Sequence, residues 1–324
     1  MDLSLFFAGT GGSVPTARRG LPALLVRRGG ENILFDCGEG TQRQLVKSIG
    51  LPEVDMVFIT HFHADHWLGL PGMLKSFDLR ERHAPLTVFG PPGTQRLLDQ
   101  TRFVYGKLGY PFTVQELENG DWVPGDGYEV QAFNVRHRGT AFGYALVEEP
   151  RPGRFDAELA TSLGVASGPD FGRLQRGETV GDVTPDRVVG PERAGRRVVI
   201  SGDTAPCERL EEAAHHADVL VHEATFVDED GARAAETGHS TARQAAELAA
   251  EADVRLLALT HVSTRYIYGR DGSHPILDEA QAVFPRVVLP RDYDQIDIPF
   301  PERGGPEVVR WSDRRTAARA EAQA

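Results

Sequence analysis

Short apolar runs alternate with longer amphipathic runs along most of the chain. The short runs are rich in branched and aromatic residues, which is typical of buried strands, whereas apolar positions three and four apart predict helices. Strands are expected at residues 3–8, 21–26, 33–35, 54–60, 86–89, 128–135, 142–147, 197–200, 220–221 and 256–259, and helices at 40–49, 67–77, 94–105 and 241–252. This alternation predicts a layered α/β fold with ligands gathered at the strand ends.

Residues 148–194 interrupt that pattern. They are rich in glycine, proline and charged residues, and their apolar residues follow no regular period. Because strand patterns resume on both sides, we interpret the stretch as a folded arm that leaves a continuous sheet, with a plain linker as the alternative. The expected organisation is a catalytic domain at 1–311 interrupted by the arm, followed by a disordered polar tail at 312–324.

Composition limits the class of protein. The 324 residues can bury a sizeable core, and the hydrophobic and charged fractions are ordinary for a globular protein. Two cysteines without a CxxC motif favour a reducing compartment, and no run reaches the ~18 apolar residues of a membrane span, so we expect a cytoplasmic protein without a membrane partner. The net charge of −12 argues against a broadly basic nucleic-acid surface, although it says little about a local patch.

One stretch, residues 60–69, holds three histidines and an aspartate within six positions. His61 and His63 leave the end of a predicted strand two residues apart, so their imidazoles point the same way. Asp65 and His66 follow where the chain turns into a helix and can return to the same place. Neutral imidazoles together with a hard oxygen ligand are a donor set that suits zinc.

Three further polar residues follow predicted strands and complete a larger set. The seven candidate metal ligands are His61, His63, Asp65, His66, His137, Asp203 and His261. Seven groups suffice for two ions, and a carboxylate such as Asp203 can bridge them. Two metals ~3.5–4 Å apart can hold a hydroxide between them and stabilise both oxygens of a phosphoryl displacement.

Other residues carry weaker signals. The glycine-rich loop at 9–15 lacks GxGxxG and the Walker lysine, so it is either a tight turn or a lining of the active site. Asp36 either orients a ligand histidine or caps a strand end. His239 stands before a predicted helix and is expected to be functional, whereas His222 is expected to be structural. Four histidines in polar contexts are expected on the surface: His83, His215, His216 and His274.

Taken together, these motifs resemble the metallo-β-lactamase superfamily and, more narrowly, the ribonuclease Z family of tRNA 3′-processing endoribonucleases. The resemblance covers roughly residues 1–300. The narrower match lies in six stretches: FDCGEGTQ at 35–42, the run at 61–72, SGDT at 201–204, HEATF at 222–226, HST at 239–241 and LTHVSTRY at 259–266.

The resemblance implies an αββα sandwich and two zinc ions per subunit, although the sequence leaves manganese open. His61, His63 and His137 would hold one ion and Asp65, His66 and His261 the other, with Asp203 bridging. Asp65 would also orient or deprotonate the attacking water. His239, positioned by Glu223, would donate a proton to the departing oxygen.

By the same resemblance, the substrate is precursor tRNA, and a hydroxide between the zinc ions removes the 3′ trailer, leaving a 3′-hydroxyl on the tRNA and a 5′-phosphate on the trailer. A homodimer is implied, in which each arm grips the tRNA elbow from the partner subunit. Arg173 and Arg176 near the arm tip are the expected phosphate contacts. The family's substrate loop, P-x-K-x-R-N, is here residues 15–20, PTARRG, where Arg18 and Arg19 are the candidate contacts.

Two alternatives remain from the sequence. A superfamily hydrolase of small esters would keep the metals, but it has no use for an arm of some forty residues. A catalytically inactive RNA-binding relative would keep the arm, but the ligand set and the His239–Glu223 pair are complete. Between residues 148 and 193 the arm has six arginines against nine acidic residues, so it is not basic overall.

Overall fold

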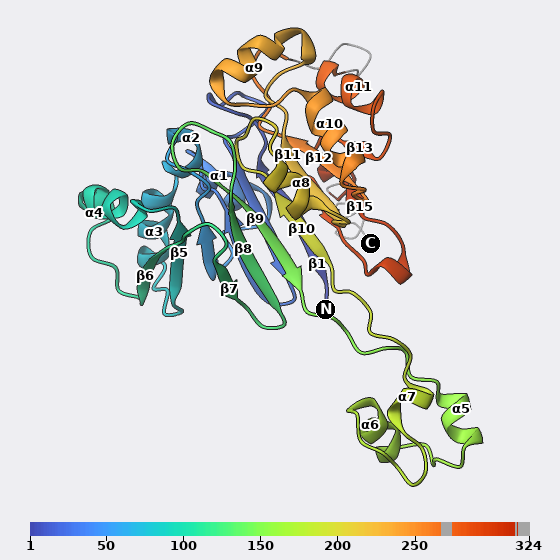
Figure 1. Ribbon diagram of the computed structural model, residues 1–324. Coiled ribbons are helices and arrows are strands. Elements are labelled where there is room, and N and C mark those ends of the chain that lie inside the picture. The colour runs from blue at the N-terminus through green and yellow to red at the C-terminus, as the bar shows by residue number, and fades with distance from the viewer. Residues whose placement is uncertain (267–273, 315, 317–324) are drawn as a thin grey trace.

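Two β-sheets stack face to face in the computed structural model, which describes residues 1–266, 274–314 and 316 (Figure 1). Within those residues the first sheet has eight strands. In spatial order they are β15 (Glu307–Val309), β14 (Gln295–Asp297), β1 (Leu3–Gly9), β2 (Ala23–Arg28), β3 (Glu31–Phe35), β4 (Met56–Phe58), β5 (Leu86–Gly90) and β6 (Phe112–Glu116). Strands β3 to β6 are parallel, and the remaining neighbours are antiparallel.

The second sheet has seven strands in the described part of the chain. Their spatial order is β13 (Val287–Val288), β12 (Leu257–Thr260), β11 (Val219–Glu223), β10 (Arg197–Ile200), β9 (Phe142–Glu148), β8 (Tyr128–Asn134) and β7 (Trp122–Pro124). Strands β10 to β13 are parallel, and β9 is antiparallel to both β8 and β10. Strands β8 and β10 therefore run in the same direction, and their carboxyl ends lie at one edge.

Strand β1 shows why the sequence forms two buried faces. Leu5 and Phe7 belong to the apolar core between the sheets, whereas Phe6 and Ala8 belong to the core under the helices of the first sheet. Successive side chains of a strand point to opposite faces, so a continuous apolar run predicts burial on both. One apolar core lies between the two sheets, and one lies under the helices on each outer face. The fold therefore has four layers, in the order helices, sheet, sheet, helices.

Helices cover the outer face of each sheet (Figure 1). The first sheet is covered by α1 (Thr41–Ser48), α3 (Leu70–Leu79) and α4 (Thr94–Tyr105), and the second by α8 (Glu208–Ala214), α10 (Ala242–Glu251) and α11 (Pro275–Gln281). Helix α10 begins with a capping box between Thr241 and Gln244, and its inner face is almost all alanine. The predicted αββα sandwich is confirmed.

The strands and helices predicted from periodicity are present, with one difference at residues 67–77. There the structure has two helices, α2 (Ala64–Trp67) and α3, separated at Gly69. A Cβ at Gly69 would lie 2.1 Å from the carbonyl oxygen of Gly38, so only glycine fits. Apolar periodicity did not reveal β6, β7, β13, β14, β15, α8, α11 or α9 (Gly231–Thr237), which are short or partly polar.

An arm leaves the body between β9 and β10 (Figure 1). Its two stalk chains pair at Arg151–Arg193 and Phe155–Val189. Beyond them, the arm head contains α5 (Ala157–Ser162), α6 (Pro169–Gln175) and α7 (Pro185–Val188) around a small core of its own: Ala160, Val165, Leu174, Val183 and Val188. That core is separate from the three cores of the body.

The C-terminal segment packs on the first sheet as far as the structure describes it. A 3₁₀ turn, η2 (Pro301–Arg303), lies between β14 and β15, and Arg314 donates to the side chain of Gln295 at 3.0 Å. Of the predicted tail, residues 315 and 317–324 lie outside the described residues. No described helix is long and apolar enough to cross a membrane.

The separate core of the arm head predicts that the head can be removed without unfolding the body. Replacing residues 154–190 by an Asn-Gly turn joins stalk chains that remain paired at Arg151 and Arg193, whose backbones exchange hydrogen bonds of 2.7 and 2.9 Å. We expect the melting temperature to change by no more than about 3 °C, measured by calorimetry. A large loss of stability would show that the head supports the body.

Candidate metal centre

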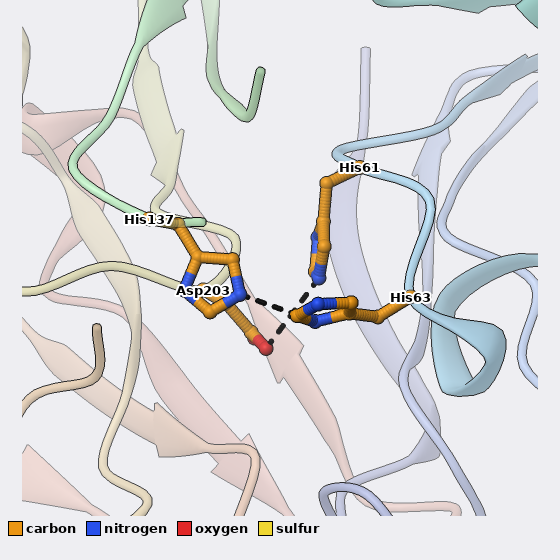
Figure 2. Close-up of side chains that lie close together, drawn as sticks. All are labelled: His61, His63, His137 and Asp203. Atoms are coloured by element: carbon orange, nitrogen blue, oxygen red, sulfur yellow. Dashed lines mark hydrogen bonds and ion pairs between the residues drawn. The ribbon is translucent and has the colours of Figure 1, made fainter. Parts of the chain in front are cut away.

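Three strand ends bring the first four candidate ligands together. His61 and His63 follow β4, His137 follows β8 and Asp203 follows β10. Because the two sheets present these ends at the same edge, the side chains point to one place (Figure 2). Their ligand atoms all lie within 4.8 Å of one another.

A second group meets the first through Asp203. Asp65 and His66 lie in α2, and His261 follows β12; their ligand atoms also fall within 4.8 Å. One oxygen of Asp203, Oδ2, lies 3.2 Å from Nε2 of His261, 3.3 Å from Nε2 of His66 and 3.7 Å from Nε2 of His61. The structure thus brings all seven predicted ligands into one site, with Asp203 between the two groups.

Asp36 fixes the orientation of two of these imidazoles. Its carboxylate accepts a hydrogen bond from Nδ1 of His66 at 2.7 Å and from the hydroxyl of Thr60 at 2.9 Å. The Thr60 hydroxyl lies 3.0 Å from Nδ1 of His61. Since its proton goes to the carboxylate, its oxygen accepts from His61, and both histidines keep Nε2 without a proton facing the centre.

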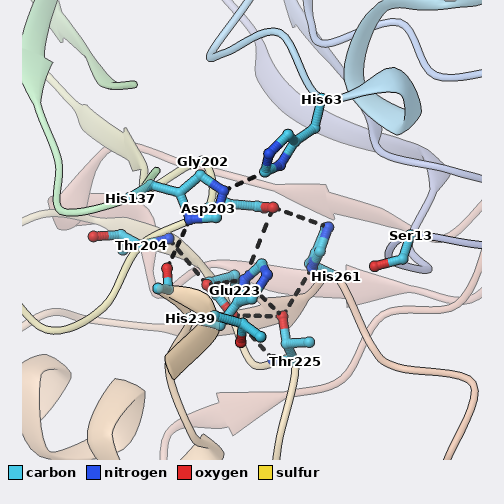
Figure 3. Close-up of polar contacts among 12 residues, drawn as sticks. Ser13, His63, His137, Gly202, Asp203, Thr204, Glu223, Thr225, His239 and His261 are labelled. Carbon is cyan, nitrogen blue, oxygen red and sulfur yellow. Dashed lines mark hydrogen bonds and ion pairs between the residues drawn. The ribbon is translucent and has the colours of Figure 1, made fainter. Parts of the chain in front are cut away.

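Thr225 orients His261 in the way that Thr60 orients His61 (Figure 3). The Thr225 hydroxyl lies 2.6 Å from Oε2 of Glu223 and 2.8 Å from Nδ1 of His261. A carboxylate only accepts, so the hydroxyl donates to Glu223 and accepts from His261. His261 therefore carries its proton on Nδ1 and turns the lone pair of Nε2 to Asp65 and Asp203.

Backbone groups fix two further side chains. Nδ1 of His137 donates to the carbonyl of Gly238 at 2.7 Å, which turns Nε2 toward His63 at 3.2 Å. The amide of Ser13 donates to Oδ2 of Asp65 at 2.7 Å. Ser13 comes from the glycine-rich loop, which thus lines the site. A Cβ at Gly12 would lie 2.5 Å from the His261 ring, so this approach requires glycine.

Non-glycine residues with left-handed backbone conformations gather here. Ser13, Asp36 and His261 have φ of 63°, 57° and 56°. Such conformations cost on the order of 1–3 kcal/mol each and persist where the surroundings impose them. Each of the three makes one of the hydrogen bonds just described, so the contacts of the site hold these residues in strained conformations.

The chemistry of these residues fits what bound metal ions require of their ligands. Nε2 of His61 is buried and has no hydrogen-bond partner among the described residues, although buried polar atoms are normally satisfied. Burial lowers the pKa of His61, of His63 and of His137, so their imidazoles are neutral and can act as ligands. An unpartnered inward lone pair beside a carboxylate is what a metal ligand offers.

The carboxylates attract positive charge to the same place. Burial disfavours a charge on His66, yet the carboxylates of Asp203 and Asp36 raise its pKa well above the usual value. Nε2 of His66 lies only 3.4 Å from Nε2 of His261. Without a proton or a metal ion these two lone pairs would face each other, so the centre requires a cation.

His239 stands beside the ligands but is held by a different partner. Its Nδ1 lies 2.8 Å from Oε1 of Glu223 and 3.9 Å from Asp203. Burial opposes its charge, but the carboxylate of Glu223 outweighs burial and raises the pKa of His239 to about 9. His239 is therefore protonated at neutral pH and can donate a proton.

The candidate substrate arginines occupy different settings. Arg18 is exposed and lines a cavity of about 740 Å³ next to the metal centre. Arg19 is buried, and its guanidinium donates to Thr10 and to the carbonyl of Pro290. In the arm head, the exposed Arg173 is paired with Asp170 and Glu178, and the exposed Arg176 also pairs with Glu178.

One of the surface predictions for histidine was wrong. His274 is only 1% exposed and precedes α11, where it packs beneath the cavity lined by Arg18. His83, His215 and His216 are exposed, as predicted, and His222 is buried.

The sequence did not identify the groups that orient the ligands. The hydroxyls of Thr60 and Thr225, the amide of Ser13 and the carbonyl of Gly238 are each within a few residues of a predicted functional residue. Threonine, serine and glycine occur everywhere, so only spatial proximity reveals these roles. Of the two interpretations of Asp36, the hydrogen bond to His66 supports the orienting one.

Comparison with known proteins gives the family. The family model described as the metallo-beta-lactamase superfamily matches residues 19–261. The chain is 44% identical to ribonuclease Z of Methanosarcina acetivorans over 304 residues, which are 92% of this chain and 99% of that protein. It is 50% identical to ribonuclease Z of Myxococcus xanthus over 270 residues, covering 82% and 88%.

Solved structures of other proteins share this fold. The short form of human tRNase Z superposes with a TM-score of 0.67 at 28% identity, covering 91% of this chain and 99% of that one. A diphosphatase of the PhnP family, at 17% identity and a TM-score of 0.62, covers 92% and 97% and shares the fold alone. This chain belongs to the metallo-β-lactamase superfamily and, within it, to the ribonuclease Z family.

Proposed function

We propose that this protein is a zinc-dependent endoribonuclease that removes the 3′ trailer from precursor tRNA in the cytoplasm. The products are a 3′-hydroxyl on the tRNA and a 5′-phosphate on the trailer. The observation that carries the proposal is the convergence of seven ligand groups around Asp203 in a chain of the ribonuclease Z family. A dinuclear centre is suited to displacement at a phosphodiester.

In this proposal His61, His63 and His137 hold one zinc ion, and Asp65, His66 and His261 hold the other, with Asp203 shared. Zinc bound there supplies water activation at neutral pH and neutralises the charge that develops on the phosphate. The donors are nitrogen and carboxylate oxygen, which manganese also accepts. The chain's own contribution is to keep each lone pair aimed inward.

Asp65 orients the attacking water in this scheme. Its Oδ2 is held by the Ser13 amide at 2.7 Å and lies 3.3 Å from Nε2 of His261. Burial opposes its charge, but His261 and His66 lower the pKa of Asp65, so it stays ionised and can accept a hydrogen bond from water. Fixing the carboxylate in advance avoids a reorganisation cost during the reaction.

His239 assists the leaving oxygen. It is protonated at neutral pH because of Glu223, and it lies next to the ligands His137 and His261, at 5.0 and 5.3 Å between ring centroids. An alkoxide is a poor leaving group, and protonation by a positioned acid typically contributes ~10²–10⁴-fold. Glu223 thus accepts a hydrogen bond from His239 directly, and it orients His261 through the hydroxyl of Thr225.

We also propose that the protein is a homodimer whose arms bind tRNA for the partner's site. Strand β9 begins near the metal centre, after His137, and ends at Glu148, where the arm starts, a span of roughly 20 Å. Strand β10 returns from the arm to Asp203. The arm therefore leaves at the edge opposite to its own active site (Figure 1), a direction that favours action in trans.

In the substrate loop we retain Arg18, rather than Arg19, as the residue that contacts RNA. Arg18 is exposed at the cavity beside the centre, whereas the guanidinium of Arg19 is used inside the protein. Arg173 and Arg176 remain the candidate contacts at the arm tip, where they would exchange their acidic partners for phosphates.

The reaction and its dependence on metal can be tested together. A tRNA precursor with a 3′ trailer should be cut once, after the discriminator nucleotide, and a chelator should abolish cleavage until zinc or manganese is restored. Asp65→Ala should lower the rate by ~10³-fold or more because water orientation is lost, while tRNA binding changes little. Mapping the new end and metal analysis give the readout; undiminished cleavage by the variant would refute the assignment.

The role of His239 can be tested with two leaving groups. His239→Ala should slow cleavage of precursor tRNA by ~10²–10⁴-fold, but should affect bis(p-nitrophenyl) phosphate much less, because nitrophenolate leaves without a proton. Steady-state rates on both substrates provide the measurement. Equal losses on the two would indicate that His239 is needed for the metal centre instead.

Action in trans can be tested by mixing two inactive proteins. One lacks the arm head (residues 154–190 replaced by a turn) and the other carries Asp65→Ala with an intact arm. Mixed dimers contain one subunit with a sound site and a partner with a sound arm, so mixing should restore up to about a quarter to a half of wild-type cleavage. Light scattering gives the oligomeric state; no recovery in proven mixed dimers would exclude the arrangement.

A further inference from the structure

The root of the arm is held by a segment from the far end of the sequence. Phe300 and Glu302 follow β14, Phe300 as the residue that precedes the turn η2 and Glu302 within it, and both contact the stalk. We call the set Arg151, Arg193, Arg196, Phe300 and Glu302 the root lock. None of these residues belongs to the metal centre, and no sequence pattern indicated that they associate.

The body side of the root lock is rigid. Arg196 is 1% exposed and makes ion pairs with Glu148, at 2.7 Å from Nε, while Nη1 donates to the carbonyl of Ile298 at 2.8 Å. Arg28 also pairs with Glu148, at 2.8 Å, so the carboxylate is held from two sides. Buried, fully paired arginines of this kind have little freedom to move.

The ring of Phe300 connects this rigid base to the stalk. The guanidinium carbon of Arg196 lies 4.0 Å from the ring centroid, and that of Arg151 lies 3.4 Å from it. Two guanidinium carbons this close to one centroid cannot share a face without overlapping, so the ring is sandwiched between them. Both cations gain from the negative faces of the ring.

Glu302 ties the two stalk chains together at the same level. Arg151 on the outgoing chain donates to both oxygens of Glu302, at 2.8 and 3.1 Å, and Arg193 on the returning chain donates at 2.9 Å. The backbones of Arg151 and Arg193 also exchange hydrogen bonds of 2.7 and 2.9 Å. The two-stranded stalk therefore cannot turn about its root without breaking the contacts to Glu302.

Among the residues that the structure describes, no hydrogen bond or ion pair joins the arm head to the body. Its core is self-contained, and the head lies away from the body (Figure 1). Between residues 154 and 190 the head has four arginines against six acidic residues, which give no net attraction to phosphate, and Arg173 and Arg176 are already paired. A freely swinging, acidic head would tend to avoid RNA, so its orientation must be imposed from the root.

We propose that the root lock is a positioning device, in which Phe300 and Glu302 fix the direction of the arm and thereby set the affinity for tRNA. This rests on the proposed function, in that tRNA is the ligand whose affinity changes. Holding the head in advance lowers the ordering cost of binding. The lock is far from the metal centre and therefore leaves the chemical step unchanged.

Arm direction can be measured without any substrate. Spin labels at Ser167→Cys in the arm head and Glu129→Cys in the body, in a Cys207→Ser background, report the distance distribution; Cys37 is buried and stays. With the labelled protein diluted in an excess of unlabelled protein, so that each dimer carries one labelled subunit, we expect one narrow distribution for the otherwise wild-type protein and a distribution about twice as broad for Glu302→Gln and for Phe300→Leu. Glu307→Gln, in the nearby β15, is the matched control, because its exposed carboxylate makes no ion pair with any described residue.

Kinetics then connects direction to function. For the two lock variants the KM for precursor tRNA should rise about tenfold, with kcat on tRNA and both constants on bis(p-nitrophenyl) phosphate within about twofold of wild type. The control should match wild type on both substrates. Equal melting temperatures for the three variants exclude a folding defect as the cause.

Two results would overturn the proposal. An unchanged distance distribution in both lock variants would show that the root lock does not set arm direction, and a broadened distribution with an unchanged KM would show that direction does not set affinity. If the wild-type protein failed to cut precursor tRNA, the proposed function would fall, whereas the distance measurement would still decide whether the lock holds the arm.

Discussion

Buried carboxylates facing a cluster of inward-pointing imidazoles are the interaction on which the rest of this structure depends. Asp203 lies within 3.7 Å of three imidazole nitrogens whose lone pairs point inward, and one of those nitrogens has no partner among the described residues. Two stacked sheets are needed to bring such groups together, because the ligands come from strand ends in both. The fold thus provides a site that requires a cation.

A second set of groups decides how the ligands face that site. Two threonine hydroxyls pass a hydrogen bond from an imidazole to a carboxylate, Thr60 between His61 and Asp36, and Thr225 between His261 and Glu223. This repeated arrangement fixes which ring nitrogen carries the proton. Because Glu223 also holds His239, ligand orientation and proton donation share one carboxylate.

The arm is attached to the body by contacts of a different kind. Its head has a separate core, and its stalk is attached through ion pairs and a sandwiched phenylalanine rather than through the apolar core of the body. Such an attachment holds the arm in one direction through a small number of contacts. It places the head away from the metal centre, while the body keeps apolar cores of its own.

The sequence by itself determined the layered fold and the seven candidate ligands, because apolar periodicity and histidine spacing are local properties that the backbone converts directly into faces and directions. It also separated the arm from the sheet. Only the tertiary structure decided that Arg19 is buried while Arg18 is exposed, that His274 is buried, and that Thr225 orients His261. It alone placed Glu302 against Arg151, some 150 positions away, since contacts between distant segments depend on how the layers pack and leave no local pattern.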